Sequence, residues 1–249
     1  MSRFKVDEYS ANKLNTVCIA HRGFSGRFPE NTILAFREAI KIGADVIEFD
    51  VQLTSDNQLI IYHDKTLLKF LKPESIISQM TLKELQSLDI GRGEKIPTFE
   101  QVLEEFSGQV GMNIHLKASG EIADRVIAIC KQTNILDEVF LAIERKEEIT
   151  RLKKSYPDVR ICSLFNRASD EIVETNKDLG IKILQPAVEV LARNGKMIVE
   201  KALNAGMIMN VFYADCFSHF QWLKRLQVAG ILTNYPDMFF ECFGRRTNK

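Results

Sequence analysis

Residues 18–64 read CIAHRGFSGRFPENTILAFREAIKIGADVIEFDVQLTSDNQLIIYHD, and this stretch carries most of the evidence on the fold. Within it, residues 46–51 form a strand-like apolar run that contains two acidic residues. Because strand side chains alternate between faces, Glu48 and Asp50 share one face of this strand. Two adjacent carboxylates repel each other unless a positive group lies between them, and a divalent cation is the obvious candidate.

A hairpin is expected directly after this strand. Residues 56–57, Asp-Asn between two short β-type runs, suit a two-residue turn. Counting back from that turn sets Asp50 opposite His63, with their Cβ atoms about 5 Å apart. His21 ends the preceding predicted strand, residues 16–20, and can reach the same place. Each feature alone is commonly structural, a solvated acidic face or a packed histidine, but their combination indicates a site.

Four motifs occur in a fixed order along this part of the chain. They are His21-Arg22-Gly23, Pro29-Glu30-Asn31-Thr32, the sequence GADVIEFDV at residues 43–51, and His63-Asp64. This series resembles the glycerophosphodiester phosphodiesterase family, within the superfamily of phospholipase C-like phosphodiesterase barrels. The sequence GILTNYPD at residues 230–237 is similar to the closing strand of that family. The resemblance therefore covers nearly the whole chain.

The remainder alternates between predicted strands and helices. Strands are expected at residues 16–20, 45–53, 110–117, 138–143, 159–164, 181–185, 207–213 and 229–233. About eight strands with intervening helices indicate an α/β fold of the (β/α)8 TIM-barrel type. An open doubly wound sheet is the rival, but the chain lacks its Gly-x-Gly-x-x-Gly turn. We expect one domain, residues 1–249, with a small insertion at about residues 65–100 after the strand-two hairpin.

Several charged residues lie at or near the ends of these strands, where barrel side chains converge on one mouth. Arg22 and Lys117 can hold the oxygens of a phosphodiester, and an arginine can do so with two parallel hydrogen bonds. A cation bound by Glu48 and Asp50 can act as a Lewis acid and orient a nucleophile. These residues therefore suit charge stabilisation of a phosphate group.

Phosphodiester hydrolysis also needs an acid and a base. His21 and His63 can supply this pair, because the pKa of a histidine lies near neutrality. The resemblance implies the same roles for both histidines, and for the phosphate and cation ligands. It also implies glycerol 3-phosphate and an alcohol as products, from diesters such as glycerophosphocholine or glycerophosphoethanolamine. Attack by a neighbouring glycerol hydroxyl, through a cyclic phosphate, and direct attack by water both stay open.

One departure from the family concerns the cation site. The family usually has a glutamate ligand in an Asn-x-Glu-x-Lys strand, whereas this chain has His115 there. The family implies Mg²⁺ or Ca²⁺, but an imidazole ligand makes Mn²⁺ or Zn²⁺ acceptable as well. The alternative is that His115 binds no cation.

Two further departures affect the expected substrate. Phe212 replaces the tryptophan that the family packs against glycerol, although ordinary barrel packing explains it nearly as well. Leu67, Leu68 and Phe70 follow His63-Asp64 where the family is often polar. Such an apolar lip favours a lysophospholipase D-like activity as the alternative, and His115 favours a catalytically impaired phosphodiester-binding protein.

Composition limits the other possibilities. Lysine plus arginine and aspartate plus glutamate both number 33, so a general affinity for nucleic acid is not expected. The first fifteen residues contain no apolar run of signal-peptide length, and no segment approaches the ~20 apolar residues of a membrane span. The five scattered cysteines suit a reducing compartment. We therefore expect a cytoplasmic enzyme without stable membrane insertion, acting on a small-molecule diester, with its oligomeric state open.

Overall fold

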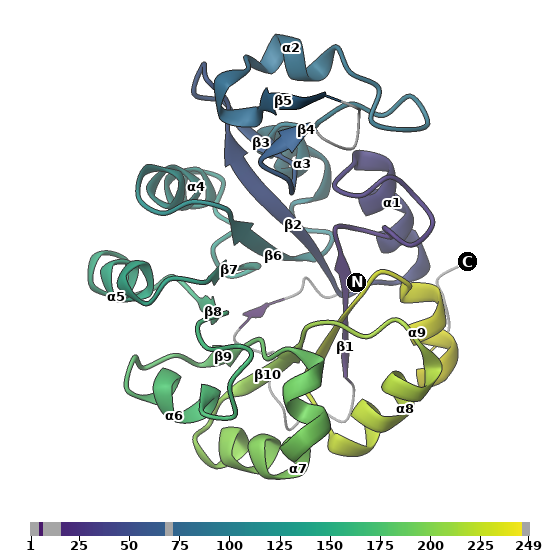
Figure 1. Cartoon of the computed structure of the whole chain (residues 1–249), viewed down its shortest axis with the longest axis vertical. Helices are drawn as coiled ribbons and strands as arrows, with labels where there is room; N and C mark the ends of the chain where they lie inside the picture. The colour runs from purple at the N-terminus through teal and green to yellow at the C-terminus, as the bar shows by residue number, and fades with distance from the viewer. Residues whose placement is uncertain (1–4, 7–15, 68–71, 246–249) are drawn as a thin grey trace.

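The computed structural model describes residues 5–6, 16–67 and 72–245. Its main sheet is a closed barrel of 8 parallel strands, because β1 pairs with both β2 and β11 (Figure 1). The barrel strands are β1 (Val17–His21), β2 (Val46–Leu53), β6 (Gly111–Leu116), β7 (Val139–Ile143), β8 (Ile161–Ser163), β9 (Ile183–Leu184), β10 (Ile208–Val211) and β11 (Gly230–Thr233). This confirms the predicted (β/α)8 barrel.

Helices surround the barrel and cover its outer face (Figure 1). They are α1 (Ile33–Ile42), α3 (Phe99–Phe106), α4 (Glu121–Gln132), α5 (Lys146–Ser155), α6 (Ile172–Lys177), α7 (Val188–Asn204), α8 (Phe217–Leu226) and α9 (Pro236–Phe243). The large apolar core lies between these helices and the strands, and a smaller apolar cluster fills the barrel interior. The alternation of strand side chains separates these two cores.

Local sequence signals define the turn from β1 to α1. Thr32 is the N-cap of α1, and its side chain accepts a hydrogen bond from the Ala35 amide. Gly43 ends the helix with φ 106°, a backbone conformation that favours glycine. At Gly23, φ is +78° and an added Cβ would lie 2.7 Å from the carbonyl carbon of Ala35. The glycine of the His-Arg-Gly motif therefore lets the loop after β1 pack directly on α1.

The hairpin after β2 differs from the prediction by one residue. β3 (Leu59–Ile61) pairs with β2 so that Val51 lies opposite Ile61, and the amide of Tyr62 donates to the carbonyl of Asp50. Tyr62, and not His63, is therefore the ladder partner of Asp50. A one-residue shift moves every side chain to the other face, so this correction matters.

Side-chain hydrogen bonds explain the longer turn. The Thr54 hydroxyl donates to Asp56 and accepts from the Gln58 amide, and Asn57 adopts φ 59°. Asp56 also accepts from the amide of Leu82 in the insertion. The loop therefore contains three residues between Thr54 and Gln58, where the prediction had two.

The insertion contains a small sheet of β4 (Thr66–Leu67) and β5 (Lys72–Ile76), then a 3-10 turn and α2 (Leu82–Gln86). It lies beyond the end of β2, at the top of Figure 1. Leu67 is fully buried in a separate apolar cluster with Ile60, Ile77 and Leu85. The prediction that Leu67 forms an exposed apolar lip is therefore wrong. Leu68 and Phe70, the rest of that lip, lie outside the described residues.

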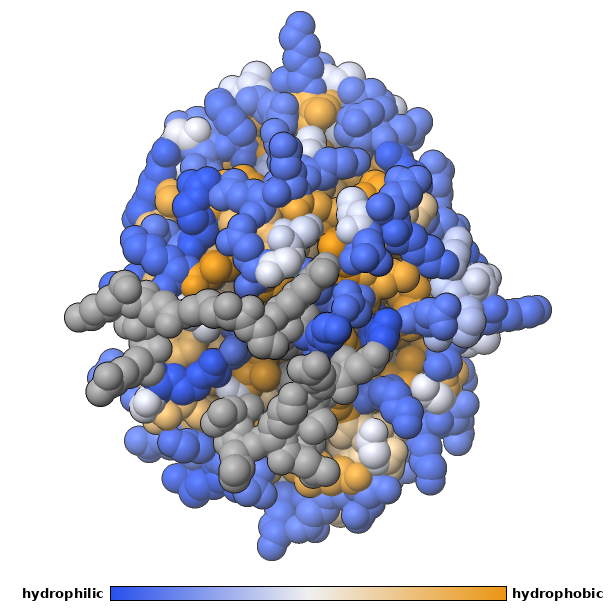
Figure 2. Space-filling view, turned by 180° about the vertical axis from the view of Figure 1, so that it is seen from behind, coloured by the Kyte–Doolittle hydropathy of each residue, from blue (hydrophilic) through white to orange (hydrophobic). Residues whose placement is uncertain are grey.

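Hydrophilic residues cover much of the side opposite to the view of Figure 1, with hydrophobic areas between them (Figure 2). Among the described residues, no helix combines the length and apolar character needed to cross a membrane. The half-buried Trp222 on α8 packs against the main core, as expected for a structural residue.

Candidate active site

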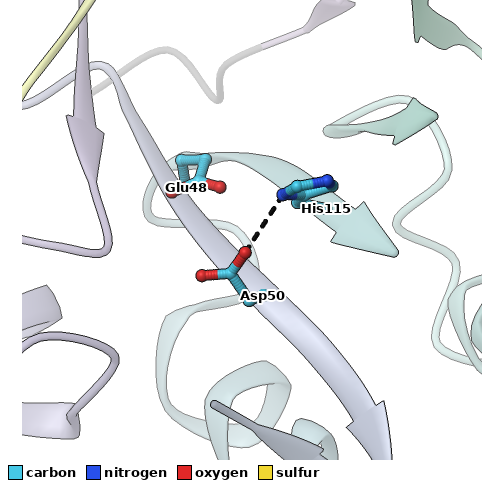
Figure 3. Close-up of side chains that lie close together, drawn as sticks. All are labelled: Glu48, Asp50 and His115. Atoms are coloured by element: carbon cyan, nitrogen blue, oxygen red, sulfur yellow. Dashed lines mark ion pairs between the residues drawn. The ribbon is translucent and has the colours of Figure 1, made fainter. Parts of the chain in front are cut away.

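Strands β2 and β6 build the centre of the site. They are parallel neighbours, with Asp50 opposite His115. Glu48, Asp50 and His115 each offer one atom to a group in which all three atoms lie within 4.8 Å of one another (Figure 3). We call these three residues the acid centre. Along β2, the inward positions thus change from the apolar Val46 to two carboxylates, as the strand alternation predicts.

Asp50 has the most polar contacts of the three residues in the acid centre, and its side chain is 1% exposed. Its carboxylate lies 3.0 Å from His115 Nδ1, 3.4 Å from Arg22 Nε and 3.6 Å from Lys117 Nζ. It also accepts a hydrogen bond from the Asn31 amide at 3.0 Å. Burial opposes ionisation, but the His115 hydrogen bond and these cations hold the pKa of Asp50 well below its usual range. Asp50 is therefore ionised at neutral pH.

Glu48 and His115 have shifted pKa values for related reasons. Burial, together with the charge of Asp50, raises the pKa of Glu48 to about 8. Burial alone would lower the pKa of His115, but the neighbouring carboxylates of Asp50 and Glu144 raise it to about 8. At neutral pH the acid centre therefore retains protons that a bound cation would displace.

His21 ends β1 and is buried, with 7% of the residue exposed. Its Nδ1 lies 2.8 Å from Oδ1 of Asn234. The Asn234 amide nitrogen donates to Asp215 at 2.6 Å, so the amide oxygen must face the histidine. An amide oxygen can only accept, so Nδ1 carries the proton. Nε2, 3.9 Å from Glu48, then has its lone pair on the side of the acid centre.

The protonation state of His21 follows from its surroundings. Burial, and then the positive charge of Arg22, lower its pKa to about 4. The Tyr213 ring stacks on His21 at 5.5 Å between centroids, and the Phe212 ring meets it edge-on at 5.4 Å. His21 is therefore a neutral imidazole held between an amide and two aromatic rings.

His63 lies near the same edge of β2 as the end of β1. Val51 pairs with both β3 and β6, so β3 lies on the edge opposite β6. β1 occupies that edge as far as Glu48, and Tyr62 bonds to the strand at Asp50. His63 follows directly after this ladder contact, on the chain that leaves β2. The predicted ladder pairing of His63 with Asp50 is wrong, and the catalytic role of His63 stays a prediction.

The conformation around His63 is fixed by its neighbours. Its Nδ1 lies 2.7 Å from Oδ1 of Asp64, and its side chain is 31% exposed. The Gln52 amide donates to the carbonyls of Tyr62 and Asp64, at 2.7 and 2.9 Å. These two hydrogen bonds from Gln52 hold the backbone on both sides of His63 against β2.

Phe212 lines a hollow of about 440 Å³ together with Tyr213, Asp215 and Arg167. The Arg167 guanidinium lies over the Phe212 ring, 4.7 Å from its centroid. Phe212 thus contacts His21, borders this hollow and also packs against the barrel interior, so its contact with substrate stays a prediction.

Four further residues of the site were not predicted as such. Asn31 and Glu30, in the Pro-Glu-Asn-Thr motif, bind Asp50 and Arg22 respectively. Asn234 fixes His21, and Glu144 lies 3.6 Å from His115 Nε2. Asn31 and Glu30 could have been found from the sequence, because they belong to the Pro-Glu-Asn-Thr motif. Asn234 and Glu144 occupy the ends of other strands, and only the barrel brings them to the acid centre.

The donor set of the acid centre fits a divalent cation. Two carboxylates and one imidazole within 4.8 Å are a combination that divalent ions of the Mg²⁺, Mn²⁺ and Zn²⁺ type accept. Lys117 and Arg22 remain beside it to meet an anionic ligand. A barrel mouth with clustered carboxylates, two cations and a neutral histidine suits an enzyme that acts on an anionic substrate such as a phosphate ester.

Comparison with known proteins identifies this class more closely. The pattern of the glycerophosphoryl diester phosphodiesterase family matches residues 21–238. The chain therefore belongs to that family, whose members are phosphoric diester hydrolases.

Three individual proteins are similar to this chain. A glycerophosphodiester phosphodiesterase from Caldanaerobacter subterraneus is 35% identical over 164 residues, which cover 61% of this chain and 68% of the relative. The crystal structure of a glycerophosphodiester phosphodiesterase from Parabacteroides distasonis has a TM-score of 0.82 at 25% identity, covering 92% of this chain and 97% of the other. A phosphodiesterase from Oleispira antarctica, solved with its product sn-glycerol-3-phosphate, has a TM-score of 0.82 at 23% identity and covers 94% of this chain and 99% of its own.

Proposed function

We propose that this protein hydrolyses glycerophosphodiesters to glycerol 3-phosphate and an alcohol at the acid centre, with the help of a divalent cation. The observation that supports this most directly is the position of the neutral His21 beside three potential cation ligands. The family assignment supports the same class of substrate.

Arg22 and Lys117 are proposed to bind the phosphate. Both lie beside the buried carboxylate of Asp50, so their charges are held at the mouth. The Nε atom of Arg22 is buried and has no hydrogen-bond partner among the described residues. A buried donor of this kind is favourable to pair with a non-bridging phosphate oxygen.

His21 and His63 are proposed to transfer the protons. Nε2 of His21 accepts the proton of the attacking hydroxyl as the new P–O bond forms. His63, whose Nδ1 is held by Asp64, gives a proton to the alcohol oxygen as the old P–O bond breaks. The attacking hydroxyl belongs either to the glycerol, giving a cyclic phosphate that water then opens, or to water itself. The base has the same position on both routes.

Glu48, Asp50 and His115 are proposed as the ligands of the cation. A divalent ion there would supply positive charge to the phosphate oxygens. The carboxylates favour Mg²⁺ or Ca²⁺, whereas the imidazole of His115 adds Mn²⁺ and Zn²⁺ to the candidates.

The test is release of glycerol 3-phosphate from a panel that contains glycerophosphocholine, glycerophosphoethanolamine and a long-chain lysophospholipid. We expect release from deacylated diesters, loss of release with a chelator, and recovery when a divalent cation is returned. Turnover of the lysolipid alone would instead identify a lysophospholipase D. Stoichiometric binding of the diesters without turnover, with every cation, would identify a binding protein.

A further inference from the structure

A second hollow lies beside the acid centre, on the side of Lys117. Its volume is about 600 Å³, within the usual size range of small-molecule sites. Residues from the rim of three neighbouring barrel strands and from the insertion form its wall, among them Gln52, Lys65, Ser78, Lys117, Ser119 and Arg145. Because Lys117 also contacts Asp50, this hollow adjoins the place proposed for the phosphate.

The two hollows lie over different parts of the barrel rim. Residues that follow β8, β9 and β10 line the hollow with Phe212, and Phe212 also contacts His21. Residues at or beyond the ends of β2, β6 and β7 line the hollow with Lys117. A phosphodiester has two organic arms on one phosphorus, so a phosphate at Asp50 can extend one arm into each hollow.

The side chains around the second hollow are mostly positively charged. Its wall contains the cations Lys65, Lys117 and Arg145 but a single carboxylate, Glu121. Neither Lys65 nor Arg145 forms an ion pair with another residue that the structure describes. The whole chain has a formal net charge of zero, so this excess of positive charge is local. Cations in a concave wall attract an anion more strongly than cations on a flat surface.

We propose that this hollow binds the alcohol arm of the diester and selects alcohols that carry a negative charge, such as a carboxylate or a second phosphate. This inference rests on the proposed function. Lys65 and Arg145 would pair with the anionic group, and the hydroxyls of Ser78 and Ser119 can donate hydrogen bonds to its oxygens. An alcohol with a cationic ammonium group would be disfavoured by the same charges.

The test uses three synthetic diesters of sn-glycerol 3-phosphate with alcohols of similar length. These are 3-hydroxypropionate, 1-propanol and ethanolamine, whose far ends are anionic, neutral and cationic. We expect kcat/KM to decrease in that order, by about 10-fold between the first and the last at low salt. The difference should shrink as ionic strength rises.

Two double variants separate this hollow from general charge effects. In Lys65→Gln with Arg145→Gln, the ratio of kcat/KM between the anionic and cationic diesters should fall to within about 2-fold. The control, Arg193→Gln with Lys196→Gln, removes the same charge from exposed positions of α7 and should keep the wild-type ratio. Thermal melting curves verify that both variants are folded.

The outcomes are distinguishable. Equal kcat/KM for all three diesters in the wild type, or an unchanged ratio in the first double variant, overturns the inference on the alcohol arm and leaves the proposed function standing. Failure to release glycerol 3-phosphate from any of the three diesters overturns both.

Discussion

At the scale of single residues, Asp215 determines which ring nitrogen of His21 carries the proton. Its two carboxylate oxygens accept from the Thr233 hydroxyl, the Asn234 amide nitrogen and the Asn234 backbone. The Asn234 side chain is thereby fixed with its oxygen toward Nδ1 of His21. This carboxylate is thus two hydrogen bonds away from the imidazole and still defines its tautomer.

Asp215→Asn tests this relay. An amide at residue 215 no longer requires Asn234 to present its oxygen to His21, so the population with an available Nε2 should fall. We expect kcat to decrease by about 10-fold and KM to change less than kcat, since Asp215 acts on His21 through Asn234 and only borders the hollow with Phe212. Steady-state kinetics on one diester measures this. The double variant Asp215→Asn with Asn234→Asp is the matched control and should retain most activity, because a carboxylate at residue 234 can accept both from Nδ1 of His21 and from the amide at residue 215. Equal losses in both variants would show that the residues matter only for structure.

The acid centre predicts a pH dependence of cation binding. Glu48 and His115 each have a pKa of about 8, and both must lose their proton to act as ligands. Affinity for Mg²⁺ should therefore increase as pH rises from 6 toward 8, with release of about two protons per ion bound at neutral pH. Calorimetric titration in buffers of different ionisation enthalpy measures this release.

His115→Gln provides the contrast for this titration. It removes one titrating group and one imidazole ligand while keeping a side chain of similar reach. If His115 is a ligand, this variant should bind Zn²⁺ much more weakly than the wild type and release fewer protons. Unchanged affinities for all cations would exclude His115 from the ligand set.

At the scale of elements, local signals define the helix starts. Thr98 caps α3, and it forms a reciprocal capping box with Gln101. Thr98→Ala removes the side-chain acceptor for the Gln101 amide, so we expect the free energy of unfolding to fall by about 1 kcal/mol. Urea denaturation measures it. Thr98→Ser keeps the acceptor and should remain within a few tenths of a kcal/mol of the wild type. A loss of the same size in both variants would contradict a capping role.

The difference between local signals and distant contacts explains which elements could be predicted from sequence. Helical spacing of apolar residues predicts a helix over residues 33–42, and α1 has these bounds, because the cap at Thr32 and the stop at Gly43 are local signals. The hairpin turn was wrong by one residue, because Asp56 binds the amide of Leu82, 26 residues away. The sequence pattern predicts a helix over residues 195–204, but α7 begins seven residues earlier, at Val188, and continues across a kink at Asn194 that has φ −137°. Distant contacts leave no signal in a local window.

At the scale of the whole molecule, strand alternation explains why most of the site was predictable. The shared face of Glu48 and Asp50 on β2 was predicted correctly, because period two is a local property. The partners of His21 were not, because Asn234 lies 213 residues further along the chain. The closed barrel brings β11 beside β1. No spacing in the sequence predicts which side chain after β11 lies against His21.

Closure of the barrel also predicts a role for Arg245. Its guanidinium binds both oxygens of Asp45 at 2.7 Å, and Asp45 accepts from the amide of Cys18 at the start of β1. Arg245→Ala should lower the free energy of unfolding by about 1 kcal/mol, since this pair is bidentate and partly buried. A double-mutant cycle with Asp45→Asn isolates the pair. A coupling energy near zero would contradict this role.

The proposed activity requires cleavage of the P–O bond to the alcohol at the acid centre. Phosphorus NMR of the 1-propanol diester, incubated with Mg²⁺ and either the wild type or Asp50→Asn, observes that bond directly. We predict that the wild type replaces the diester signal with that of sn-glycerol 3-phosphate, and that Asp50→Asn, folded by its melting curve, is slower by at least about 100-fold. A wild-type sample that leaves the diester intact with every divalent cation, or that leaves the phosphate on propanol, would contradict it.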